Sequence, residues 1–103
     1  MIFVVLASHN AEVCPTSNSK TRDLMMQNAQ QMSAIAQRLG VKLIAGPFVN
    51  REHISVVIVE STAEALDQFL VDSHLAQWNS VKVLPSVPIE EGLRQATEAT
   101  MLF

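Results

Sequence analysis

The sequence predicts a single α+β domain over residues 1–103, with the order strand, helix, strand, strand, helix, strand and a short C-terminal helix. Short apolar runs rich in β-branched residues alternate with two longer segments whose apolar residues recur every three or four positions. These are the periods of strands and of amphipathic helices. No stretch of the chain resembles a linker long enough to separate two domains.

The predicted strands are short, and two of them are apolar on both alternating faces, as strands buried on both sides are. They cover residues 2–7, 41–49, 53–59 and 81–84. Gly46-Pro47 interrupts the second strand and places it at a sheet edge, because proline cannot donate to a strand ladder. Pro85 and Pro88 are expected to end the fourth strand.

The first predicted helix runs from about Thr21 to Leu39 and stops at Gly40. A polar loop ending in Ser17-Asn18-Ser19 precedes it, and these side chains can accept hydrogen bonds from the free amides of a helix start.

The second predicted helix begins at Ser61, because Ser61-Thr62-Ala63-Glu64 matches a capping box in which Ser61 and Glu64 satisfy first-turn amides. It continues or restarts through Asn79. Residues 90–101 predict a short third helix that packs Leu93, Ala96 and Met101.

This order of elements is the split βαβ arrangement of ferredoxin-like domains, in which right-handed crossovers place strands one and three side by side and antiparallel in the centre of a four-stranded sheet. Two helices cover only one face of such a sheet, yet strands one and three are apolar on both. The chain is also 49% hydrophobic, with a mean hydropathy of +0.22. We therefore expect a homodimer formed through the open sheet face.

Charge and length exclude several classes of protein. The net charge is −3, and the 7 basic residues are scattered along the chain. The sequence therefore lacks the clustered positive charge that is typical of proteins that bind nucleic acids or anionic membranes. The apolar run at residues 2–7 is too short for a membrane span or a signal-peptide core. The single Cys14 excludes an intrachain disulfide, so a cytoplasmic location is expected.

The apolar first strand, the turn after it and residues 72–93, DSHLAQWNSVKVLPSVPIEEGL, resemble the dimeric α/β-barrel superfamily. The resemblance covers nearly the whole chain in its order of elements and implies two ferredoxin-like sheets paired into a barrel. The superfamily includes cofactor-free oxygenases, haem-handling proteins, muconolactone isomerase-like enzymes and stress-induced proteins. The resemblance therefore implies an architecture and not one chemistry.

One rim of the domain is expected to collect the chemically capable side chains, because the end of strand one lies beside the start of strand three. These side chains are His9, Cys14, His53, His74 and Trp78. Polar groups that converge beside an apolar interior are typical of a small-molecule site.

Each of the four ionisable candidates at this rim has two interpretations. His9 and His53 are a proton-sharing pair or two strand ends in solvent. His74 orients or deprotonates a substrate, or caps the last carbonyls of a helix. Cys14 is an activated nucleophile or a half-buried structural thiol.

No cofactor and no metal site is predicted. The three histidines and the cysteine lack any short ligand spacing, so only tertiary convergence at the rim would bring them together. The chain has no glycine-rich phosphate loop, no nucleophile elbow and no paired acidic motif.

The predicted ligand is a small apolar molecule, with a fatty acid-like carboxylate as the leading class. Met25, Met26, Met32 and Phe69 offer adaptable apolar volume for a cavity between sheet and helices, although methionine also fills cores. The amides around Asn18 and Ser19, with Lys20 or Arg22, are the expected counter-group for a carboxylate.

Three function classes follow. The first is a homodimeric protein that binds a small hydrophobic molecule. The alternative is a cofactor-independent enzyme, an oxygenase, isomerase or decarboxylase, with His9, His53 or His74 as proton carrier. A structural or regulatory subunit would need a further exposed patch.

Overall fold

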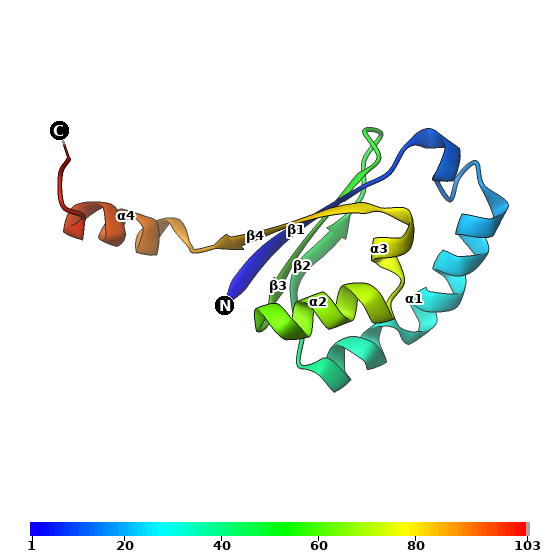
Figure 1. The fold of residues 1–103 in the computed structure, drawn as a ribbon, viewed down its shortest axis with the longest axis horizontal. Coiled ribbons are helices and arrows are strands. Elements are labelled where there is room, and N and C mark those ends of the chain that lie inside the picture. The colour runs from blue at the N-terminus through cyan, green and yellow to red at the C-terminus, as the bar shows by residue number, and fades with distance from the viewer. Residues whose placement is uncertain (103) are drawn as a thin grey trace.

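A computed structural model describes residues 1–102 and confirms the predicted βαββαβ order. The strands are β1 (Ile2–Ser8), β2 (Lys42–Phe48), β3 (Ile54–Glu60) and β4 (Ser80–Ser86); the helices are the 3-10 turn η1 (Ala11–Val13), α1 (Ser19–Leu39), α2 (Ala63–Asp72), α3 (Leu75–Trp78) and α4 (Ile89–Glu98). The four strands form one antiparallel sheet of order β2-β3-β1-β4, and α1, α2 and α3 lie on one side of it (Figure 1). This is the ferredoxin-like arrangement.

The core forms where β1 and β3 meet α2. The pairing of β1 with β3 sets Phe3 opposite Val59, so both point to the helical side of the sheet. Phe3 and Val5 are each only 2% exposed, and Leu66 of α2 packs against them. The predicted central, antiparallel pair of strands is confirmed.

The ends of α1 follow from its sequence. The Asn18 side chain accepts a hydrogen bond from the amide of Thr21, and Gly40 adopts the left-handed conformation with φ 76° that closes the helix. The helix starts two residues earlier than the periodicity predicted, because the cap lies at Asn18 and the apolar pattern begins only after the first turn.

The cap of α2 corrects the predicted capping box. The hydroxyl that accepts from the amide of Ala65 belongs to Thr62 and not to Ser61. Ser61 is still engaged with the sheet, because its amide donates to the carbonyl of Met1, so the helix starts one residue later.

Each of the two edge strands contains one proline. β2 lies at the edge, as Gly46-Pro47 predicted, and its register with β3 shifts on either side of Ala45. β4 forms the other edge and includes Pro85, which corrects the prediction that Pro85 ends this strand. An edge strand tolerates proline because one side of it needs no ladder partner.

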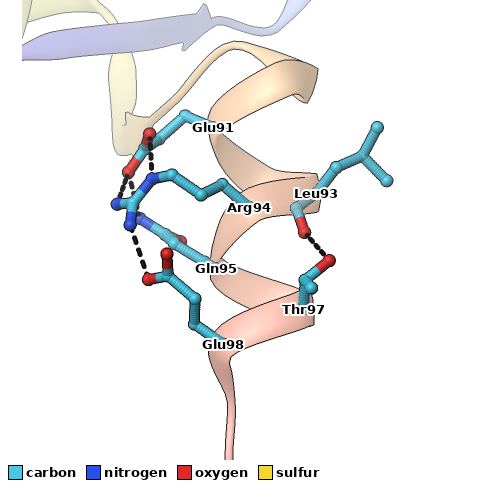
Figure 2. Close-up of polar contacts among 6 residues, drawn as sticks. All are labelled: Glu91, Leu93, Arg94, Gln95, Thr97 and Glu98. Carbon is cyan, nitrogen blue, oxygen red and sulfur yellow. Dashed lines mark hydrogen bonds and ion pairs between the residues drawn. The ribbon is translucent and has the colours of Figure 1, made fainter.

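The C-terminal helix α4 corrects the prediction that it packs on the domain. It projects away from the sheet at the end of β4 (Figure 1), and Leu93 is 61% exposed. Arg94 pairs with Glu91 and Glu98 on one side of the helix, whereas Leu93 lies on the other side (Figure 2). The helix therefore has a polar face of internal ion pairs and an apolar face that no other part of residues 1–102 covers.

Gly46 should be sensitive to substitution and Gly92 should not. Gly46 has φ 88°, and a Cβ there would lie 2.6 Å from the carbonyl oxygen of Val56, whereas a Cβ on Gly92 of α4 meets nothing within 4 Å. We expect Gly46→Ala to lower the free energy of unfolding by more than about 1 kcal/mol. The matched Gly92→Ala variant should raise it by up to about 1 kcal/mol. Urea unfolding measures both, and equal effects would contradict this account of β2.

Candidate functional site

A cavity of about 1070 Å3 lies between α1 and the sheet. Its walls are mostly apolar side chains from α1, α2, α3 and strands β1, β2 and β3; they include Val5, Met25, Met32, Leu43, Val57, Leu66, Phe69 and Trp78. The cavity is open between α1 and β2, where Leu43 is 54% exposed.

The cavity opens because α1 meets the core at only one end. Ala36 and Leu39, near the C-terminus of the helix, pack against the core cluster. Towards the N-terminus α1 diverges from the sheet (Figure 1), and the small side chains of Ala29 and Ser33 face the space that results. Small residues on this face keep the volume free.

The polar rim forms at the joined ends of β1 and β3. The amide of His9 donates to the carbonyl of His53 over 3.1 Å, so the strand pairing continues to both histidines. Their rings lie edge to face with centroids 5.3 Å apart. The predicted convergence of His9 and His53 is present, although His53 precedes β3 and is not part of it.

His53 is held in a conformation that a side chain other than glycine seldom adopts. Its φ is 60°, in the left-handed region. The Asn50 side chain stabilises the turn, because its Oδ1 accepts hydrogen bonds from the amides of Glu52 and Ile54. Left-handed residues of this kind concentrate at functional sites, where the surrounding structure offsets the strain.

The ring of His9 is oriented by Asn79, which follows α3. His9 Nδ1 and Asn79 Oδ1 lie 3.0 Å apart, and Asn79 Nδ2 donates to the carbonyl of Leu75. Because Oδ1 only accepts, Nδ1 carries a proton, and in the neutral ring the lone pair is at Nε2. Nε2 is buried and has no hydrogen-bond partner among residues 1–102. The rim thus presents a buried, unpaired nitrogen lone pair.

The thiol of Cys14 lies beside these rings at the end of η1. The residue is buried, and its carbonyl accepts from the amides of Ser17 and Asn18. The Thr16 hydroxyl lies 3.0 Å from Sγ. Hydrogen bonds from the hydroxyl and amide of Thr16, with smaller contributions from the two histidine side chains, lower the pKa of Cys14 to about 6.

His9, Cys14 and His53 form a compact cluster at the rim where the order of strands predicts them, although their spacing in the sequence has no metal-ligand pattern. One ring nitrogen from each histidine and the Cys14 Sγ all lie within 4.8 Å of one another. His53 lies far from the other two in the chain, so the strand pairing and the η1 turn are both needed to bring all three together. Sequence analysis also missed Thr16, which activates the thiol, and Asn79, which orients His9.

The other predicted site residues divide into two groups. Met25, Met32, Phe69 and Trp78 line the cavity, and the Trp78 ring lies 5.1 Å from the ring of His9. Five residues lie outside the lining: Asn18, Ser19, Arg22, Met26 and His74.

These five have structural positions of their own. Asn18 caps α1, Ser19 is the first residue of that helix, and the Arg22 side chain donates to the carbonyl of Pro15. Met26 is exposed. His74 occupies a left-handed position between α2 and α3, and its amide donates to the carbonyl of Val71. The predicted counter-group at the start of α1 is therefore not part of the cavity.

Fold and site define the chain as a ferredoxin-like α+β domain with an apolar cavity and a histidine–cysteine rim. Comparison with protein-family models, curated proteins and solved structures gives no match. Within residues 1–102, no helix combines the length and the apolar character needed to cross a membrane.

Cys14 should alkylate as a low-pKa thiol. Because its pKa is lowered to about 6, the reactive thiolate is populated above that pH and lost below it. We expect the rate of reaction with iodoacetamide to rise between about pH 5 and 7 and then level off. The rate for an ordinary thiol would continue to rise up to about pH 9. Replacing Thr16 by valine should move the profile to higher pH. A wild-type profile centred on the ordinary thiol range would contradict the assigned hydrogen bonds.

Proposed function

We propose that the chain binds a small hydrophobic molecule in the cavity between α1 and the sheet. The observation that carries the proposal is the cavity itself, about 1070 Å3 of mainly apolar lining with polar groups gathered at one rim. Ligand sites commonly combine an apolar body with a few orienting polar groups. The opening beside Leu43 provides a route of entry for an elongated guest.

A carboxylate is the polar group that best fits the rim. His53 and Asn50 line this end of the cavity and offer N–H donors from an imidazole ring and a side-chain amide. The start of α1 is a weaker candidate, because the Asn18 side chain already accepts from the Thr21 amide there. A fatty acid-like molecule would lie with its chain along Met25 and Met32 and its head towards the histidines.

We also propose that a second copy of the chain covers the open sheet face, as in the dimeric α/β-barrel superfamily. The face opposite the helices is mainly apolar; it carries Ile2, Val4, Leu6, Phe48, Ile54, Val56, Ile58 and Leu84. Charge on this face is limited to Lys82 and to the Lys42–Glu60 pair near one end of the sheet. An apolar surface of this extent favours burial against a partner.

The size of the exposed surface supports a dimer. The chain exposes 7434 Å2, whereas a compact monomer of 11.3 kDa is expected to expose about 5,700 Å2. The excess of about 1,700 Å2 exceeds the roughly 800 Å2 that each partner of a standard interface buries. The sheet face and the apolar side of α4 together offer enough area for an extensive two-fold interface.

Filling the cavity should abolish ligand binding. Trp78 is the single tryptophan and lines the cavity, so its fluorescence should change when the protein is titrated with fatty acids of increasing chain length. We expect Ala29→Phe, which projects a ring into the cavity from α1, to weaken binding by at least about tenfold, the cost of roughly 1.4 kcal/mol.

The control is Ala34→Phe, an exposed position on the same helix that does not line the cavity. This variant should bind as the wild type does. Equal binding by both variants, or no fluorescence response and no co-purified lipid by native mass spectrometry, would overturn the proposal.

A charge at the centre of the open face should dissociate the dimer. Val4 lies opposite Ile58 on one side and Leu84 on the other, so Val4→Lys places an ammonium in the middle of the proposed interface. Sedimentation velocity should show a wild-type dimer and a folded Val4→Lys monomer. Val71→Lys, at an exposed apolar position on α2, is the matched control and should remain dimeric. A wild-type monomer at micromolar concentration would refute the assembly.

A further inference from the structure

We infer that His9, Cys14 and His53 bind a divalent zinc-type metal ion at the mouth of the cavity. The inference does not depend on the apolar ligand, because it rests on the side chains of the rim alone. Thiolate and imidazole are the ligands that zinc prefers in proteins, and three protein ligands with one open position are the arrangement of its reactive sites.

The separation of the three ligand atoms is close to that of a tetrahedral site. They lie within 4.8 Å of one another. Zinc bonds to nitrogen and sulfur are about 2.1 and 2.3 Å long, which places tetrahedral ligand atoms about 3.4 to 3.8 Å apart. Small side-chain rotations that move each atom by about 1 Å therefore close the site, with no change in the strands.

The surroundings of His9 are those of a metal ligand. Metal-bound histidines nearly always donate their second ring nitrogen to an oxygen acceptor, which fixes the tautomer and aims the lone pair. Here Asn79 Oδ1 accepts from Nδ1, and the bond from Asn79 Nδ2 to the Leu75 carbonyl fixes the orientation of the amide. The remaining Nε2 is buried without a partner among the described residues. A buried lone pair in this state is costly unless it binds something.

The backbone holds the other two ligands in place before any ion binds. The carbonyl of His53 is tied to the amide of His9, and the Asn50 side chain stabilises the left-handed turn at His53. Cys14 is held by the η1 turn, through the bond from its amide to the Ala11 carbonyl.

The open coordination position faces the cavity, since all three ligand residues line it. A divalent ion with one thiolate and two neutral imidazoles has a net charge of +1, and a carboxylate as fourth ligand makes the site neutral. Neutrality matters in an apolar cavity, where an unbalanced charge is costly. This last step rests on the proposed function, and it identifies the carboxylate of the apolar ligand as the fourth ligand.

Cobalt and zinc titrations of chelator-treated protein test the site. We expect one Co2+ per chain, with a thiolate-to-cobalt charge-transfer band and the intense visible bands of a tetrahedral ion, and displacement of Co2+ by one Zn2+. Cys14→Ser should abolish the charge-transfer band and weaken Zn2+ binding by more than about 100-fold. Asn79→Ala should weaken it by about 10- to 100-fold, because it removes only the orienting bond to His9.

The matched control is His74→Asn, which removes the histidine outside the cluster and suits the left-handed backbone at that position. It should bind Zn2+ as the wild type does. His53→Asn, which suits its own left-handed position in the same way, should lose binding and provides a second ligand variant should Cys14→Ser fail to fold. Circular dichroism of each metal-free variant confirms folding.

Two results would overturn the site: no stoichiometric Co2+ binding by the wild type, or an equal loss of binding in His74→Asn and His53→Asn, which would indicate an adventitious ion only. Fatty-acid titration with and without Zn2+ separates this inference from the proposed function. Fatty-acid binding that is unaffected by Zn2+ would overturn only the fourth-ligand assignment. Zn2+ binding without fatty-acid binding would overturn the proposed function and leave the metal site in place.

Discussion

The antiparallel pairing of β1 with β3 is the constraint on which both the core and the rim depend. Within the strands it places Phe3 beside Val59 and forms the apolar surface against which α2 packs. One residue beyond β1 the pairing continues as a hydrogen bond from the His9 amide to the His53 carbonyl. A slip of the register by one residue would turn the core side chains to the open face and separate the two histidines. Folding and site assembly are therefore one event in this chain.

The second constraint is the shortage of helical cover. Two helices shield one face of a four-stranded sheet, and α1 shields even that face only near its C-terminus, where Ala36 and Leu39 meet the core. The incomplete contact creates the cavity, and the bare opposite face creates the need for a partner. Ligand binding and assembly are thus proposed for two surfaces that the same fold leaves uncovered.

Residue periodicity predicted the strands, the two main helices and the edge position of β2, because burial on a sheet or helix face repeats with a fixed period. Periodicity was less successful at the start of α2, which is set by a single hydrogen bond. The amide of Ser61 donates to the carbonyl of Met1, and the side chain of Thr62 caps the helix. The pairing of His9 with His53 followed from strand order. Cys14 was expected at the same rim, but its close approach to the pair depends on the η1 turn, which is irregular backbone with no periodic signal.

The projecting α4 has a consequence for the order of the chain terminus. An isolated helix of ten residues is marginal in water, since its few backbone hydrogen bonds barely offset the entropy of forming the first turn. Arg94 and its two glutamates add little, because exposed ion pairs are weak. The helicity of this arm therefore depends on whatever covers Leu93. If its cover is another copy of the chain, α4 is a coil-to-helix element whose folding rises with protein concentration.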